Sequence, residues 1–373
     1  TSVKLTKHES IAVPRAEFKK LQAGPTVLCD SPISTNFSNT NAGEFVFGTR
    51  NGEIALLKWG EQKKPLLKQI TKSPLSHVQF IANNSFPLIL ATNSLGYFHA
   101  FQFNEKVKDV KPATCFRICN GSCEFECSEL DRKIFVVPTI QQIIESSSSS
   151  YLSPNVIETG NSSKAMIYDI QKEKMIGNVS SRWGRVRKIH AFSTMRDVIA
   201  VCSEKFELYD TRTDTSNSVV TYDKSGVAVF DVGYLDPLLS NSSNNNNSGV
   251  FAAPSSLSLS EYFALGHKNS AASLIDIRVQ EAVKTFQLAS EDSATLSFAA
   301  QGEAGAAVIG NAKGLFMVDL FHERKSEITA VSHKFFSKGK KINNVKQCIF
   351  HNHKFRLAVL QEPNEIVTFI EES

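Results

Sequence analysis

The sequence predicts an all-β fold, a β-propeller of seven blades that forms one domain over residues 1–373. Many short strand-like segments are separated by glycine, asparagine and serine turns, and no stretch has the period of a helix. A segment that ends in an acid recurs, as Met166–Asp169, Phe206–Asp210, Leu274–Asp276 and Phe316–Asp319. Once two insertions are set aside, the copies lie about 40–45 residues apart, which is typical of a four-stranded blade.

The predicted strands fall into seven sets of three that follow one another along the chain. Residues 66–71 form a further strand before the second set, and Asn51-Gly52 predicts a tight hairpin turn inside the first set. In chain order the sets are 25–30, 44–49 and 53–59; 77–82, 88–92 and 97–103; 124–128, 134–139 and 164–170; 186–192, 198–203 and 205–210; 227–232, 262–267 and 272–277; 295–299, 306–310 and 315–320; 345–350, 355–361 and 365–370.

The seventh set has no fourth strand, because only three residues follow Ile370. We expect the N-terminal segment Ser2–Val13 to supply it, so that the last blade is closed by an N-terminal strand. Closure of this kind removes the exposed sheet edges that invite aggregation.

Two insertions interrupt the repeat, at about 145–163 and 238–260. The first contains the serine tract Ser146–Ser150 and the second the asparagine tract Asn244–Asn247. Such tracts bury too little apolar surface to offset the entropy of ordering them, so both insertions are predicted to be disordered.

Composition is that of a globular protein, with 42% apolar and 21% charged residues and a net charge of +4. No apolar run approaches the roughly 18 residues of a membrane helix, so no membrane span is predicted. The chain opens with neither a signal-peptide pattern nor an initiator methionine, and we expect a trimmed or processed domain. Seven cysteines, an odd number, favour reduced thiols and hence the nucleus or cytoplasm.

The recurring pairs Tyr168-Asp169, Tyr209-Asp210, Ile275-Asp276 and Val318-Asp319 occupy the place of a Trp-Asp signature, and on these residues the chain resembles the WD-repeat family. The resemblance implies a rigid platform for proteins, peptides or nucleic acids. The family's Gly-His pair is almost absent, with Ser76-His77 as its best remnant. We therefore expect stability to come from apolar packing between blades.

The most pointed functional signal is a tryptophan among four cations in the segment Arg182–Lys188, with a second basic segment at Lys338–Lys341. In the family that the chain resembles, connections of this type lie on the top face near the central channel. Stacking combined with charge suits an acidic peptide or single-stranded nucleic acid. The alternative is that the charges are solvated and that the indole packs between blades. The predicted partner-binding residues are Arg182, Trp183, Arg185, Arg187, Lys188, Lys338, Lys340 and Lys341.

Three other patterns are weaker. The cysteines at 115, 119, 123 and 127 suggest zinc, but in a strand a four-residue step spans about 13 Å, and no metal site is predicted. His351 and His353 fit a surface turn. The Asp-x-Arg form of Asp210–Arg212 and Asp276–Arg278 resembles a motif that docks propellers onto a ubiquitin-ligase adaptor, although the arginine can equally pair with a neighbouring acid.

Enzyme signatures are missing from the sequence, including the nucleophile elbow, the zinc-protease motif and a phosphate loop. We therefore predict no catalytic residues and no cofactor. The favoured function is a non-catalytic interaction scaffold in a multi-subunit intracellular complex, and the serine and asparagine tracts are typical of a eukaryotic protein. The alternative is a propeller that binds RNA or single-stranded DNA through the same loops. An enzyme with its site at the central channel is the third hypothesis.

Overall fold

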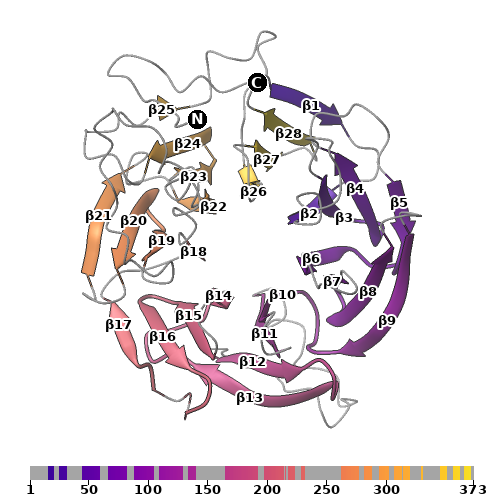
Figure 1. Ribbon diagram of the computed structural model, residues 1–373, viewed down its shortest axis with the longest axis horizontal. Helices are drawn as coiled ribbons and strands as arrows, with labels where there is room; N and C mark the ends of the chain where they lie inside the picture. The colour runs from indigo at the N-terminus through magenta and orange to yellow at the C-terminus, as the bar shows by residue number, and fades with distance from the viewer. Residues whose placement is uncertain are drawn as a thin grey trace, which may run out of the picture.

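The computed structural model contains seven four-stranded antiparallel sheets arranged as the blades of a ring (Figure 1). The predicted all-β, seven-bladed propeller is therefore confirmed. The structure describes residues 16–20, 25–31, 44–58, 66–81, 88–104, 109–128, 133–139, 164–191, 197–213, 215, 217–222, 228–231, 262–276, 281–287, 294–301, 306–312, 314–319, 329–330, 345–350, 356–361 and 365–370. Among these residues no helix is long and apolar enough to cross a membrane.

Each blade runs from an inner strand beside the axis of the ring to an outer strand at its rim (Figure 1). The inner strands are β2 (Pro25–Ser31), β6 (Leu75–Ile81), β10 (Cys123–Ser128), β14 (Lys188–Ala191), β18 (Ala228–Asp231), β22 (Thr295–Gln301) and β26 (Val345–Phe350). The second strands are β3 (Glu44–Thr49), β7 (Leu88–Asn93), β11 (Lys133–Pro138), β15 (Val198–Cys202), β19 (Tyr262–Gly266), β23 (Ala306–Asn311) and β27 (Arg356–Gln361). We number the blades one to seven in this order.

The third strands are β4 (Glu53–Lys58), β8 (Tyr97–Asn104), β12 (Lys164–Asp169), β16 (Phe206–Asp210), β20 (Ala271–Asp276), β24 (Gly314–Asp319) and β28 (Glu365–Ile370). The recurring acids thus end the third strands of blades three to six. The outer strands are β5 (Leu66–Gln69), β9 (Asp109–Arg117), β13 (Lys174–Ser180), β17 (Val220–Tyr222), β21 (Glu281–Gln287), β25 (Thr329–Ala330) and, in blade seven, β1 (Ala16–Lys20).

The ring is closed by an N-terminal strand, as expected, but the segment was predicted wrongly. Strand β1 pairs antiparallel with β28, and Phe18 lies opposite Val367. The predicted segment Ser2–Val13 lies outside the described residues. Residues 17–22 look ambiguous in sequence because an outer strand has a neighbour on one side only and needs few apolar residues. The insertions at 145–163 and 238–260 also lie outside the described residues.

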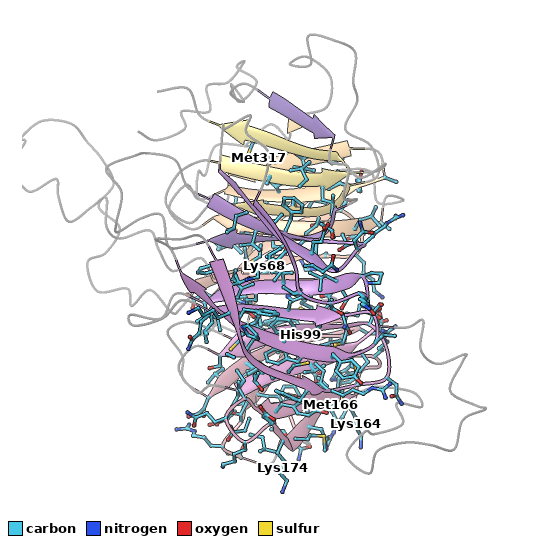
Figure 2. The ribbon with its side chains drawn as sticks, turned by 90° about the vertical axis from the view of Figure 1, so that its right-hand side faces the viewer. Lys68, His99, Lys164, Met166, Lys174 and Met317 are labelled. Carbon is cyan, nitrogen blue, oxygen red and sulfur yellow. The ribbon has the colours of Figure 1, made fainter. Side chains whose placement is uncertain are left out.

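Buried apolar side chains cluster between neighbouring blades, which confirms the expected inter-blade packing. One cluster joins blades two and three and includes Phe98, Phe125 and Met166. Another joins blades seven and one, through Phe47 and Leu360. Figure 2 shows the ring from its side, with Lys68 of blade one and His99 of blade two labelled. The Lys68 Nζ atom donates to the Val110 carbonyl at 2.6 Å, a further tie between these blades.

The predicted turn at Asn51-Gly52 is confirmed, because Gly52 has φ +77° and its N–H donates to the Thr49 carbonyl at 3.1 Å. A Cβ atom on Gly52 would lie 2.3 Å from the Thr71 carbonyl oxygen. The tip of this hairpin therefore packs directly against the segment that leads into blade two, a position where only glycine fits.

Candidate functional site

Residues 181–187 connect outer strand β13 to inner strand β14, so the predicted site segment is indeed an outer-to-inner connection. The hairpins between second and third strands end on the same side of the ring, since each second strand runs back antiparallel to its inner strand. We call this side the top face. Loop 181–187 contacts the hairpin at 203–205 there, and Lys268 of the hairpin at 267–270 contacts Glu204 in turn.

Trp183 is 42% exposed, so it does not pack between blades. The Lys205 Nζ atom lies 3.7 Å from the centre of the indole, a cation–π contact between the loop and the β15–β16 hairpin. The Glu204 N–H donates to the Trp183 carbonyl at 3.2 Å. The loop and the hairpin thus form one surface, and the exposed indole on it is available to stack against a ligand.

A buried polar network supports this surface from below. The Ser181 Oγ donates to the Glu207 carboxylate at 2.5 Å and contacts the Ser203 Oγ at 3.0 Å. The Tyr209 hydroxyl bonds to the same carboxylate at 3.1 Å and to the Ser180 carbonyl at 2.8 Å. Burial, followed by the charge of Glu207, raises the pKa of Tyr209. Because buried polar groups are costly to leave unpaired, the network fixes where the loop starts.

The arginines of the loop have different surroundings. Arg182 is exposed and bonds to the Asn217 side chain. Arg185 is half-buried and donates from Nη2 to the Pro138 carbonyl at 2.9 Å, while its Nε is buried without a hydrogen-bond partner among the described residues. Burial, and then the charge of Arg187, lower the pKa of Arg185. Arg182 is the exposed one among the described cations of the predicted set, since Arg185, Arg187 and Lys188 are half-buried.

Lys188 lies apart from the other predicted residues, at the start of inner strand β14. Its Nζ pairs with Glu124 of β10 at 3.0 Å, and His190 Nδ1 lies 3.5 Å from Glu126. With His77 of β6, these side chains bring together titratable groups from the inner strands of blades two, three and four. The attraction of Lys188 lowers the pKa of Glu124, although burial opposes that shift.

Three predicted residues, Lys338, Lys340 and Lys341, lie outside the described residues, as do His351 and His353. The segment that holds these lysines does connect β25 to β26, the same type of connection as 181–187.

Glu204, Lys205 and Lys268 complete the top-face surface, and none of them was predicted from the sequence. One weak pattern in the sequence marks the hairpins that carry such residues. In several blades the second strand ends at, or is directly followed by, a serine, threonine, asparagine or histidine. In blade four the Ser203 Oγ accepts the Lys205 N–H at 3.2 Å and so shapes the hairpin tip. In blade two the Asn93 Oδ1 accepts the N–H of Leu95 at 3.1 Å. The buried members of this set are Thr49, Asn93, Ser203, His267 and Asn311.

The remaining candidates are placed as follows. Cys119, Cys123 and Cys127 are buried while Cys115 is exposed, and within the described part of the chain no three histidine, cysteine or acidic residues are arranged to hold a metal. Arg212 pairs with its own Asp210, through Nε at 2.9 Å and Nη2 at 2.6 Å, and so uses its charge locally. That hydrogen bonding lowers the pKa of Asp210 to about 2. In the second Asp-x-Arg copy, Asp276–Arg278, the arginine lies outside the described residues.

Comparison with solved structures places the fold among known propellers. The chain is similar to the crystal structure of Raptor from Chaetomium thermophilum, with a TM-score of 0.66 over 97% of this chain and 13% sequence identity. It spans about 30% of the length of that protein. No family model and no curated protein sequence matches the chain. The likeness concerns the propeller fold.

Proposed function

We propose that this propeller is a non-catalytic protein-interaction scaffold that binds an acidic partner or peptide on its top face. The observation that carries the proposal is the exposed indole of Trp183 with Lys205 stacked on it, beside Arg182. Exposed aromatic and arginine side chains are the residues that most often dominate binding energy. Arg187 and Lys268 pair with Glu204, while Arg182 and Lys205 add charge beside the indole, and this excess of cations on the exposed surface favours an anionic partner.

The proposal places the chain in a multi-subunit complex of the nucleus or cytoplasm. The scaffold role has architectural support, because a closed ring of antiparallel blades is stiff and loops on a rigid scaffold present binding residues without a large ordering cost. The compartment is proposed from the odd number of cysteines. Among the described inner-strand groups, Glu124 is paired with Lys188 and Glu126 lies 3.5 Å from His190, so these two acids are engaged within the fold.

Replacing Trp183 with alanine and Arg182 with glutamate should weaken binding of an acidic peptide at least about tenfold, because both changes remove accessible groups. The measurement is a titration of a fluorescein-labelled, glutamate-rich dodecapeptide followed by anisotropy. Matched controls are Ile176→Ala, an exposed apolar residue on β13, and Lys172→Glu, a 73% exposed cation at the opposite end of blade three. Binding by the double variant equal to that of the original protein would refute the proposal.

The nucleic-acid alternative is tested in the same titration with a labelled single-stranded oligothymidylate. Phosphate contacts release counterions, so oligonucleotide affinity would fall steeply with salt. If the oligonucleotide bound more tightly than the peptide and lost affinity in the Trp183 variant, the alternative would replace the proposal.

A further inference from the structure

One carboxylate already occupies an anion site among the described residues of the top face. The Lys268 Nζ atom lies 2.9 and 2.8 Å from the two carboxylate oxygens of Glu204, and Arg187 Nη2 pairs with the same carboxylate. The three residues come from the loop before β14, the β15–β16 hairpin and the β19–β20 hairpin. Arg187 of blade four and Lys268 of blade five therefore bind the same carboxylate, that of Glu204.

The backbone holds Glu204 at this point. Its N–H donates to the Trp183 carbonyl, and a Cβ atom on Gly184 would lie 3.3 Å from the Glu204 Cγ. Gly184 has φ +99°, a conformation that glycine adopts readily and other residues rarely do. The next residue after Glu204, Lys205, stacks on Trp183. The carboxylate and the indole platform are therefore parts of the same small unit.

The pair of cations remains accessible from solvent. The side chain of Glu204 is 55% exposed, that of Lys268 42% and that of Arg187 26%. The hydrogen bond from Lys268, and then the charge of Arg187, lower the pKa of Glu204, so the carboxylate is ionised near neutral pH. An anion that takes the position between these two cations must displace this carboxylate.

We propose that Glu204 is an internal competitor for the clamp formed by Arg187 and Lys268, and that it makes the top face selective for a phosphorylated peptide over a merely acidic one. The proposal rests on the proposed function of the same surface. A carboxylate that replaces Glu204 exchanges one charge for an equal one and gains little. A phosphomonoester carries about −1.5 to −2 charges and three acceptor oxygens, so it contacts both cations and adds charge.

The charge of the phosphate group also distinguishes a phosphorylated peptide from a nucleic acid. A phosphodiester of a nucleic acid carries one charge per phosphate, as a carboxylate does, and should not displace Glu204 any better. The flanking peptide then lies over Trp183 and beside Arg182, which gives the phosphorylated chain contacts that free phosphate lacks. The expected ligand is therefore a phosphorylated side chain in an extended peptide.

The test uses three fluorescein-labelled peptides of alternating glycine and alanine that differ at one central residue, which is phosphoserine, aspartate or serine. The unchanged protein should bind the phosphoserine peptide at least about tenfold more tightly than the aspartate peptide. Glu204→Gln should bind the aspartate peptide about tenfold more tightly than the unchanged protein does, because a neutral amide competes less strongly than a carboxylate for the two cations. Lys268→Met, added to Glu204→Gln, should abolish that gain.

Glu173→Gln is the matched control, since it neutralises an exposed carboxylate at the opposite end of blade three, and it should leave all three affinities unchanged. Thermal unfolding of each variant shows whether the fold is retained. If Glu204→Gln leaves the affinity for the aspartate peptide unchanged or lowers it, Glu204 is not a competitor and the inference is overturned. If Glu204→Gln gives the gain but Trp183→Ala has no effect on any peptide, the inference stands and the proposed role of Trp183 fails.

Discussion

Replacing Phe98 with alanine is expected to lower the free energy of unfolding by about 3–5 kcal/mol, through lost burial and the cavity left behind. Phe98 is fully buried, at 0% exposure, between blades two and three. Its ring centre lies 5.3 Å from that of Phe116 and 5.4 Å from that of Phe125. Phe116 belongs to its own blade and Phe125 to the next, so the change weakens both a blade and a blade interface.

Urea unfolding followed by tryptophan fluorescence measures this effect. The control is the adjacent aromatic residue of the same strand, Tyr97, which is exposed and has the Arg117 guanidinium 5.8 Å from its ring centre. Tyr97→Ala should cost less than about 1 kcal/mol, because it removes surface contacts. Similar losses for the two variants would contradict the assignment of Phe98 to a rigid inter-blade core.

His77 is expected to make the protein about 3 kcal/mol less stable at pH 4 than near pH 7, since each tenfold change in proton affinity corresponds to about 1.36 kcal/mol. Its pKa is lowered from 6.5 to about 4, first because burial disfavours the imidazolium and then because Lys188 repels it, while Glu124 and Glu126 offset part of the shift. Below pH 6.5 the unfolded chain takes up a proton that the folded chain does not. Stability is therefore lost as the pH falls toward 4, and the loss levels off below that pH.

The measurement is the free energy of unfolding from pH 7 to pH 4 for the unchanged protein and for His77→Gln. The carboxylates titrate in both proteins, so the difference between the two curves isolates His77. That difference should change by about 3 kcal/mol across this range. Lys188→Met, which removes the second cause, should reduce the change. Parallel curves for the unchanged protein and His77→Gln would show that His77 is not held neutral by its surroundings.

The blade count was predictable because seven sets of three strands follow one another along the chain, and the recurring acids that end four of the third strands support the period. The three strands of each set were also predictable, since both faces of an inner strand are packed and the residues are apolar or alternate. Outer strands were harder. Strand β1, with the residues Ala16–Lys20, is ambiguous in sequence because an outer strand pairs on one side only, and its pairing with β28 depends on a segment at the other end of the chain.

The candidate site was half predictable. Trp183 and Arg182 could be identified because a tryptophan among arginines in a connection is rare in a core. The partners that define the rest of the site could not be, because pairing across blades leaves no local pattern. Glu204 is far in sequence from Lys268, and only the ring brings them together. Similarly, Lys188 looks like one more loop cation until its bond to Glu124 is seen.

The pairing of β1 with β28 has a consequence for how the chain folds. During synthesis, Ala16–Lys20 leaves the ribosome long before its partner Glu365–Ile370 is made. Blades one to six can form in order as their strands are made. Strand β1, however, stays without its partner until β28 is made at the end of blade seven. Contacts between such distant segments are slow to form, and open edges associate with other chains in the meantime. The ring is therefore most prone to aggregate just before β28 arrives, and closure completes the fold in one late step.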